Sequence, residues 1–191
     1  MKKLIPYCAL LITICACADN TAQQAEVFEQ QAQNKIKTLA KNLKQELSGA
    51  MQSGGPVAAV QTCNLKAQEI THALNNGISI KRTSLKLRNS KNAPDAWETQ
   101  ILNSFEEKLA EGTPIDQLTH SETIKTASGN TFRMMRAIPT QGLCLSCHGD
   151  KQTMSNELVS ILEEAYPNDQ ATDYQVGQIR GAFSVTQNIE N

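Results

Sequence analysis

One short segment of the sequence, Cys144-Leu145-Ser146-Cys147-His148, combines two thiols and an imidazole that can bind a porphyrin and its iron. Two residues between the cysteines allow both sulfurs to reach the two vinyl groups of one porphyrin, and the adjacent histidine then offers a ring nitrogen to the iron. Gly149 follows, which lets the chain turn away without placing a side chain against the ring. The pattern therefore predicts one covalently bound c-type haem, with His148 as the proximal ligand.

Two other chemistries use cysteines at this spacing. A zinc site needs four ligands, which Cys63, Cys144, Cys147 and one histidine could supply. A redox disulfide between Cys144 and Cys147 needs no histidine. Neither chemistry uses the adjacency of Cys147 and His148, so haem attachment is the preferred interpretation.

The N-terminus has the features of a secretory signal peptide. Lys2 and Lys3 precede an apolar stretch, Leu4 to Ala18, of about 15 residues, which is shorter than the roughly 20 needed to span a bilayer and argues against a retained anchor helix. We therefore predict a signal peptide at residues 1–18, a tether at 19–27 and one domain at 28–191.

Two cleavage sites are open. Ile14-Cys15-Ala16-Cys17 resembles a bacterial lipobox, which implies lipidation of Cys17 and, with Ala18 next, sorting to the outer membrane. Ordinary cleavage after Ala18 is the alternative. Either way the domain is expected in the periplasm, where it keeps Cys63, Cys144 and Cys147. Haem attachment with a third cysteine as iron ligand would use all three.

Apolar periodicity predicts helices at residues 26–48 and 56–74 around a break at 49–56, a third helix beginning at 92–95 and ending at 112–114, and a short helix at 157–165. Strands are predicted at 78–87, 119–127, 131–138 and 179–187. Helices come early and strands late, so the predicted class is α+β with an antiparallel sheet.

The second iron ligand has several candidates. Cys63 lies on the apolar face of helix 56–74, where an ordinary buried thiol is also expected. Met134 and Met135 are neighbours in a strand, so one of them must face the core. His72 falls on the polar side of its helix, and His120 stands near a strand start. The residues alone leave Cys63 and a methionine both open.

Several ordered stretches together resemble one bacterial family. They are Cys63-Asn64-Leu65-Lys66-Ala67, Ile80-Lys81-Arg82-Thr83-Ser84-Leu85-Lys86-Leu87-Arg88-Asn89, Asn92-Ala93-Pro94-Asp95-Ala96-Trp97-Glu98, Cys144-Leu145-Ser146-Cys147-His148-Gly149 and Gly181-Ala182-Phe183-Ser184-Val185. Over about residues 28–185 the chain resembles a family of single-haem c-type domains of long-unknown function. Its members have a PAS-like fold and occur alone or as extracytoplasmic sensor domains, and we expect this copy to stand alone.

The resemblance implies a His/Cys-ligated haem packed against the N-terminal helices, with His148 proximal and Cys63 distal. Arg82 and Arg88 are predicted to contact the haem propionates, because arginine binds carboxylates through two parallel hydrogen bonds. Arg88 with Asn89 could instead cap the turn before the third helix. Trp97, at helical spacing, is expected in the core rather than on the haem.

Three functions remain in view. The preferred one is a redox- or gas-responsive module, in which release of Cys63 lets CO or NO bind and a signalling partner reads the change. The alternative is a periplasmic electron-transfer cytochrome, which the small size and single haem favour. A peroxidase-like enzyme is disfavoured because no distal acid–base pair is evident. The formal net charge of -1 gives no electrostatic basis for binding nucleic acid.

Overall fold

A computed structural model describes residues 16–127 and 129–190, with side chains described for 21–127 and 129–189. The predicted signal peptide falls mostly on residues 1–15, outside the described residues, and the side chain of Cys17, the predicted lipidation site, also lies outside them. Within the described ranges, no helix combines the length and the apolar character that crossing a bilayer requires.

The longest element, α1 (Ala16–Ala73), consists of two helical halves joined at a kink. The kink lies at Gly54 and Gly55, and Gly55 has a φ of 68°, a conformation that glycine adopts without steric cost. Pro56 then begins the second half, where a missing amide hydrogen does no harm. The break predicted at residues 49–56 is thus confined to the glycine pair, because a lone glycine such as Gly49 costs a helix only about 1 kcal/mol.

Residues 19–27, expected to form a tether, are helical and belong to α1. This segment contains two alanines, two glutamines and a glutamate, all of which are strong helix formers. Its polar composition therefore did not indicate an irregular backbone.

Four antiparallel strands form one sheet in the order β1-β4-β3-β2. The strands are β1 (Ser79–Thr83), β2 (Thr119–Thr126), β3 (Gly129–Pro139) and β4 (Ile179–Glu190). The predicted hairpin and final strand are confirmed, but the strand predicted at residues 78–87 ends at Thr83. The Ser84 hydroxyl donates to the carbonyl oxygen of Arg180 at 2.8 Å and lies 3.0 Å from that of Lys86, and these side-chain contacts replace ladder pairing.

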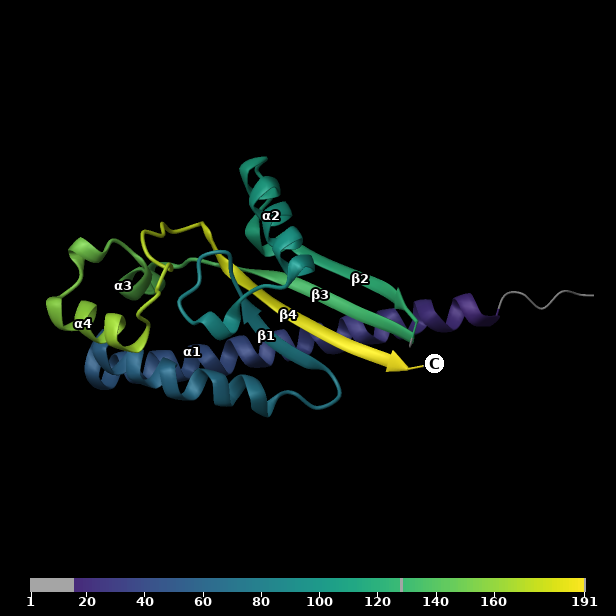
Figure 1. The fold of residues 1–191 in the computed structure, drawn as a ribbon, viewed down its shortest axis with the longest axis horizontal. Coiled ribbons are helices and arrows are strands. Elements are labelled where there is room, and N and C mark those ends of the chain that lie inside the picture. The colour runs from purple at the N-terminus through teal and green to yellow at the C-terminus, as the bar shows by residue number, and fades with distance from the viewer. Residues whose placement is uncertain (1–15, 128, 191) are drawn as a thin grey trace, which may run out of the picture.

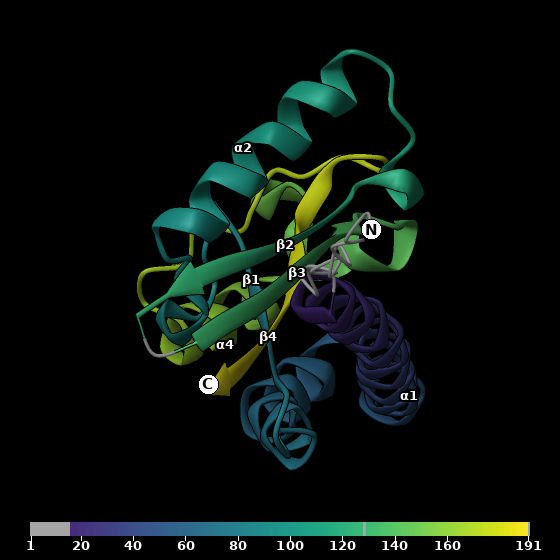
Figure 2. The same ribbon diagram turned by 90° about the vertical axis from the view of Figure 1, so that its right-hand side faces the viewer.

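Helices cover both faces of the sheet (Figures 1 and 2). The first half of α1 packs on one face, where Phe28 and Leu39 lie in a cluster with Met134. Helix α2 (Ala96–Ala110) packs on the other face, where Phe105 lies in a cluster with Met135. The two methionines thus point to opposite faces, as strand alternation requires. The arrangement confirms the α+β class.

A third, smaller core forms at the end of the molecule where α1 bends (Figure 1). Here Val60 of α1 clusters with Leu158 and Leu162 of α4 (Asn156–Ala165), and Cys147 and Tyr166 pack against them. The short α3 (Leu145–His148) lies in this region, preceded by a 3-10 turn at Gly142–Cys144. Loop 166–178 then leads to β4. This end therefore brings together the second half of α1, the Cys144–His148 segment and loop 166–178.

Candidate functional site

The Cys144–His148 segment is a compact helical turn. Cys63, Cys144 and Cys147 are half-buried free thiols, and the Gln141 amide donates to Cys144 Sγ at 3.3 Å. A Cβ at Gly149 would lie 2.7 Å from the carbonyl oxygen of Leu145. A glycine is therefore needed after His148, because any side chain there would clash with the backbone of the same turn.

His148 is held in one tautomer. Its Nδ1 lies 2.8 Å from the carbonyl oxygen of Ala171, and a carbonyl can only accept, so Nδ1 carries the hydrogen. Nε2 is left with a lone pair, which faces the Nε–H of Arg180 at 3.4 Å. Burial lowers the pKa of His148 well below its ordinary value, and the charges of Arg180 and Arg88 lower it further. The ring is thus neutral, the form in which histidine binds metals.

The backbone around His148 is fixed as well. The amide of Tyr174 donates to the His148 carbonyl oxygen at 2.9 Å, and the amide of Asp173 donates to that of Gly149 at 3.0 Å. Tyr174 also packs edge-on against the imidazole, with ring centroids 6.2 Å apart. Loop 166–178 therefore acts as the outer support that metal-binding histidines usually have.

Cys63, on the second half of α1, reaches the same region. Its thiol interacts electrostatically with Cys147 and with Tyr166. Burial raises the pKa of Cys63, whereas the charges of Arg82 and Arg88 oppose the rise. Among the described residues, no group of three or more His, Cys, Asp or Glu side chains is close enough to hold a metal ion, so the four-ligand zinc arrangement does not form there.

The other candidate ligands pack elsewhere. Met134 and Met135 are fully buried in the two cores that flank the sheet. His72 is exposed, as its helical position predicted, and His120 lies 3.5 Å from Glu122. Trp97 packs beside the α2 core, as expected.

Arg88 is bound by protein groups. It forms a buried ion pair with Asp169 at 2.9 Å, and it also donates to the carbonyl oxygens of Ala171, at 3.2 Å, and of Cys147. Asn89, rather than Arg88, caps the next turn by accepting from the amide of Lys91. Arg88 therefore ties the cysteine segment to loop 166–178.

Arg82 has a different environment. Its Nε is buried without a hydrogen-bond partner, and across the described part of the chain its guanidinium has no ion pair. It nevertheless interacts electrostatically with Cys63, His148 and Tyr166. The structure thus brings Cys63, Arg82, Arg88 and the Cys144–His148 segment into one region.

Sequence reasoning missed the contribution of loop 166–178 and of Arg180. Arg180 Nη1 donates to Ser84 Oγ at 3.1 Å, and its guanidinium lies 5.4 Å from the centroid of the Tyr174 ring. The length of this irregular loop was a usable signal, because long loops inside compact domains are often functional.

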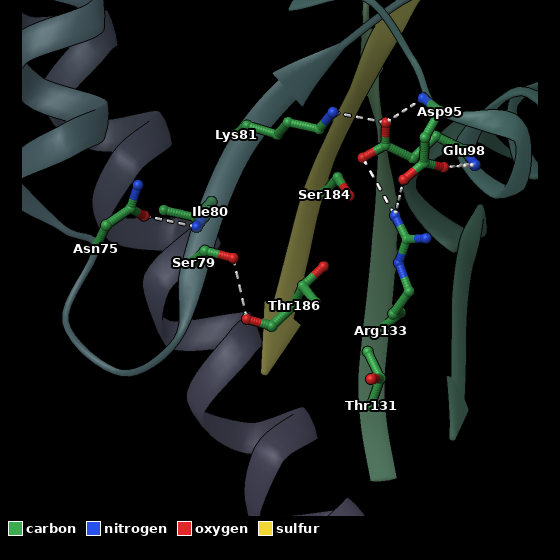
Figure 3. A pocket seen from close by; sticks show the side chains of 10 residues that line it. All are labelled: Asn75, Ser79, Ile80, Lys81, Asp95, Glu98, Thr131, Arg133, Ser184 and Thr186. Carbon is green, nitrogen blue, oxygen red and sulfur yellow. Dashed lines mark hydrogen bonds and ion pairs between the residues drawn. The ribbon is translucent and has the colours of Figure 1, made fainter. Parts of the chain in front are cut away.

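Two cavities lie away from this region. One, of about 400 Å³, lies on the α2 face of the sheet, bounded by Lys81, Glu98 and Arg133 (Figure 3). There the fully buried Glu98 carboxylate lies 2.8 Å from Lys81 Nζ and 3.5 Å from Arg133. These ion pairs, with the capping box of Asp95 and Glu98, fasten the start of α2 to the sheet.

The fold and the site define a class of protein: an α+β domain in which a cysteine from the N-terminal helix meets a Cys-x-x-Cys-His segment beside an antiparallel sheet. The chain belongs to the Tll0287-like family, whose model matches residues 16–188. The solved structure of the cyanobacterial heme-protein Tll0287 is 28% identical, and the similarity covers 84% of this chain and 98% of that chain with a TM-score of 0.57. No curated protein matches the chain. The predicted membership of a bacterial haem-protein family is thus confirmed.

Proposed function

We propose that this chain binds one c-type haem through thioether bonds from Cys144 and Cys147, with His148 and Cys63 as the axial iron ligands. The observation that carries this proposal is the state of His148, whose Nδ1–H is held by Ala171 while Nε2 keeps its lone pair. The likeness to a named heme-protein supports the same cofactor. Bound haem would supply a one-electron redox centre that can also take a diatomic gas.

The surrounding residues fit such a group in charge and in surface. Among the described side chains near His148, Arg82 and Arg180 lack a carboxylate partner, and haem carries two propionates. Leu143 is 41% exposed and Leu85 is 39% exposed, so apolar surface is available for a flat porphyrin to cover. The Nε of Arg82 is buried without a hydrogen-bond partner, which is unfavourable and favours an anionic ligand at this place.

The function that we favour is a redox- or gas-responsive module. Cys63 and His148 come from separate elements, and Val60, one turn before Cys63, packs in the small core with α4. Release of Cys63 from the iron would therefore allow α1 to shift relative to α4. CO or NO could then bind at the vacated iron position. A signalling protein partner would read that change.

An electron-transfer cytochrome of the periplasm is the second candidate. Cys144 is half-buried and its neighbour Leu143 is exposed, which would bring one haem edge close to the surface. A partner protein could exchange electrons there. We propose no enzymatic activity for either function.

We further propose that the protein is exported to the periplasm and held at the outer membrane by a lipidated Cys17. The basic and apolar N-terminal residues and the lipobox-like stretch support this location. The intact mass of the mature protein distinguishes a lipidated N-terminal cysteine from simple cleavage after Ala18.

Absorption and EPR spectra of protein exported from a host competent in cytochrome maturation test the haem assignment. We expect a low-spin ferric haem with thiolate features that disappear in Cys63→Ala. The matched control is His72→Ala, an exposed residue on the same half of α1, which should leave the spectrum unchanged. A colourless wild-type protein, or a mass without the haem increment, would end the proposal.

CO binding to the reduced protein separates the two functions. A responsive module should bind CO once Cys63 is released, whereas a simple carrier should keep both ligands and cycle reversibly. Failure to bind CO at any practical concentration would leave electron transfer as the better proposal.

A further inference from the structure

We propose that Arg82 and Arg180 each bind one haem propionate, and that Arg88 binds only groups of the protein itself. This inference rests on the proposed function and adds to it a residue, Arg180, that no sequence pattern singled out. It also divides three neighbouring arginines into two ligand-binding side chains and one structural side chain.

Arg82 requires an anion from outside the described protein groups. It projects from β1 and interacts with Cys63 and with His148, the two proposed axial ligands, so it lies beside the expected porphyrin. Its buried Nε has no hydrogen-bond partner. A buried guanidinium without a counter-charge is unfavourable, and a carboxylate is the group that its fork of donors matches best.

Arg180 stands at the other proposed ligand atom. Its Nε lies 3.4 Å from Nε2 of His148, while Nη1 bonds to neutral oxygen atoms, Ser84 Oγ at 3.1 Å and the Lys86 carbonyl at 3.3 Å. No carboxylate of the described residues forms an ion pair with it. The charge of the Asp169 carboxylate acts on Arg180 without forming an ion pair with it. Iron bound at Nε2 would displace the Arg180 Nε–H from that nitrogen, which would leave the guanidinium free to turn to a propionate.

The charges of Arg82 and Arg180 interact with each other. Arg82 is on β1 and Arg180 is on the neighbouring strand β4, just before Gly181. A Cβ on Gly181 would lie 2.3 Å from the carbonyl oxygen of Thr83, so the two strands approach very closely at this point. The arginines therefore flank one end of the sheet, next to the haem segment.

Arg88 is not available to bind a propionate, because protein groups already occupy its donors. The carboxylate of Asp169 neutralises its charge, and two backbone carbonyls occupy further donors. The three guanidinium groups and Asp169 together carry two excess positive charges. Two propionates carry two negative charges, so a single haem balances the site.

A cation close to the haem favours the reduced state, because reduction adds a negative charge. We therefore expect Arg82→Gln and Arg180→Gln each to lower the midpoint potential, and the double variant to lower it further. Arg180→Lys keeps the charge but loses the paired hydrogen bonds, so its potential should stay closer to wild type. The propionate bending modes in resonance Raman spectra should shift in every Arg82 and Arg180 variant.

Potentiometry and resonance Raman spectroscopy of the haem-loaded, full-length protein test the inference. Lys108→Gln, which removes the same charge from an exposed position on α2, is the control and should change neither measurement. Arg88→Lys, which keeps the counter-charge of Asp169, should leave the propionate modes unchanged.

An Arg180→Gln protein with attached haem, wild-type potential and wild-type propionate modes would overturn the role of Arg180. A shift of those modes in Arg88→Lys as large as that in Arg180→Lys would overturn the division of roles. Both results differ from a failure of the proposed function, in which wild-type protein carries no haem. If the glutamine variants do not accumulate, the lysine variants give the same Raman test.

Discussion

Replacing Arg88 by methionine should destabilise the protein far more than removing an ion pair on its surface. The side chain of Arg88 is 11% exposed and that of Asp169 is 4% exposed, and their charged atoms lie 2.9 Å apart. The substitution leaves the Asp169 carboxylate buried without its counter-charge, which typically costs about 3–5 kcal/mol. The carbonyl oxygens of Ala171 and Cys147 lose a donor as well. We expect a loss of about 3–5 kcal/mol in the free energy of unfolding.

An exposed pair provides the matched control. Lys66 and Glu46 lie 3.2 Å apart, but their side chains are 55% and 43% exposed. Water already solvates both charges, so Lys66→Met should change the free energy of unfolding by no more than about 1 kcal/mol. The contrast depends on burial, since both substitutions remove a cation from a short ion pair.

Urea denaturation of the haem-loaded wild type and both variants measures these values. Adding Asp169→Asn to Arg88→Met should recover part of the loss, because it removes the uncompensated charge. A loss in Arg88→Met no larger than in Lys66→Met would refute the reasoning. It would show that Asp169 reaches water or another cation.

Two further predictions concern the backbone and pH. Gly181→Ala should sharply lower the melting temperature, because φ is 156° and the new Cβ would lie 2.3 Å from the Thr83 carbonyl oxygen. Gly49→Ala adds a Cβ that has no neighbouring atom within 4 Å, so it should stabilise the protein by about 1 kcal/mol. Equal melting temperatures for the two variants would contradict both predictions. Burial alone would raise the pKa of Asp95, but hydrogen bonds from Arg133 and a backbone amide lower it overall. The stability it contributes is therefore present above its unfolded pKa of about 3.9 and lost as pH falls through the lower folded value. Asp95→Asn should flatten the acid-side fall in unfolding free energy, and an unchanged slope would count against that pairing.

Local patterns predicted most of the elements. Apolar spacing located α2, α4 and the β2–β3 hairpin, because one face of each must be buried. The strand predicted at 78–87 was too long because Ser84 bonds to carbonyls outside the ladder, a contact between residues distant in the sequence. Residues 19–27, predicted as a tether, are helical because their polar residues are also good helix formers.

For the site, too, some residues could be predicted from local sequence and others only from the tertiary structure. The sequence by itself predicted Cys144, Cys147 and His148 as a set, because five consecutive residues contain the whole spacing that covalent haem attachment uses. Only the tertiary structure decided the surroundings: the Ala171 carbonyl that sets the His148 tautomer, the Asp169 carboxylate that occupies Arg88, and the position of Arg180 at Nε2. These contacts join residues far apart along the chain, and no local periodicity encodes which donor meets which acceptor once the sheet and α1 have packed.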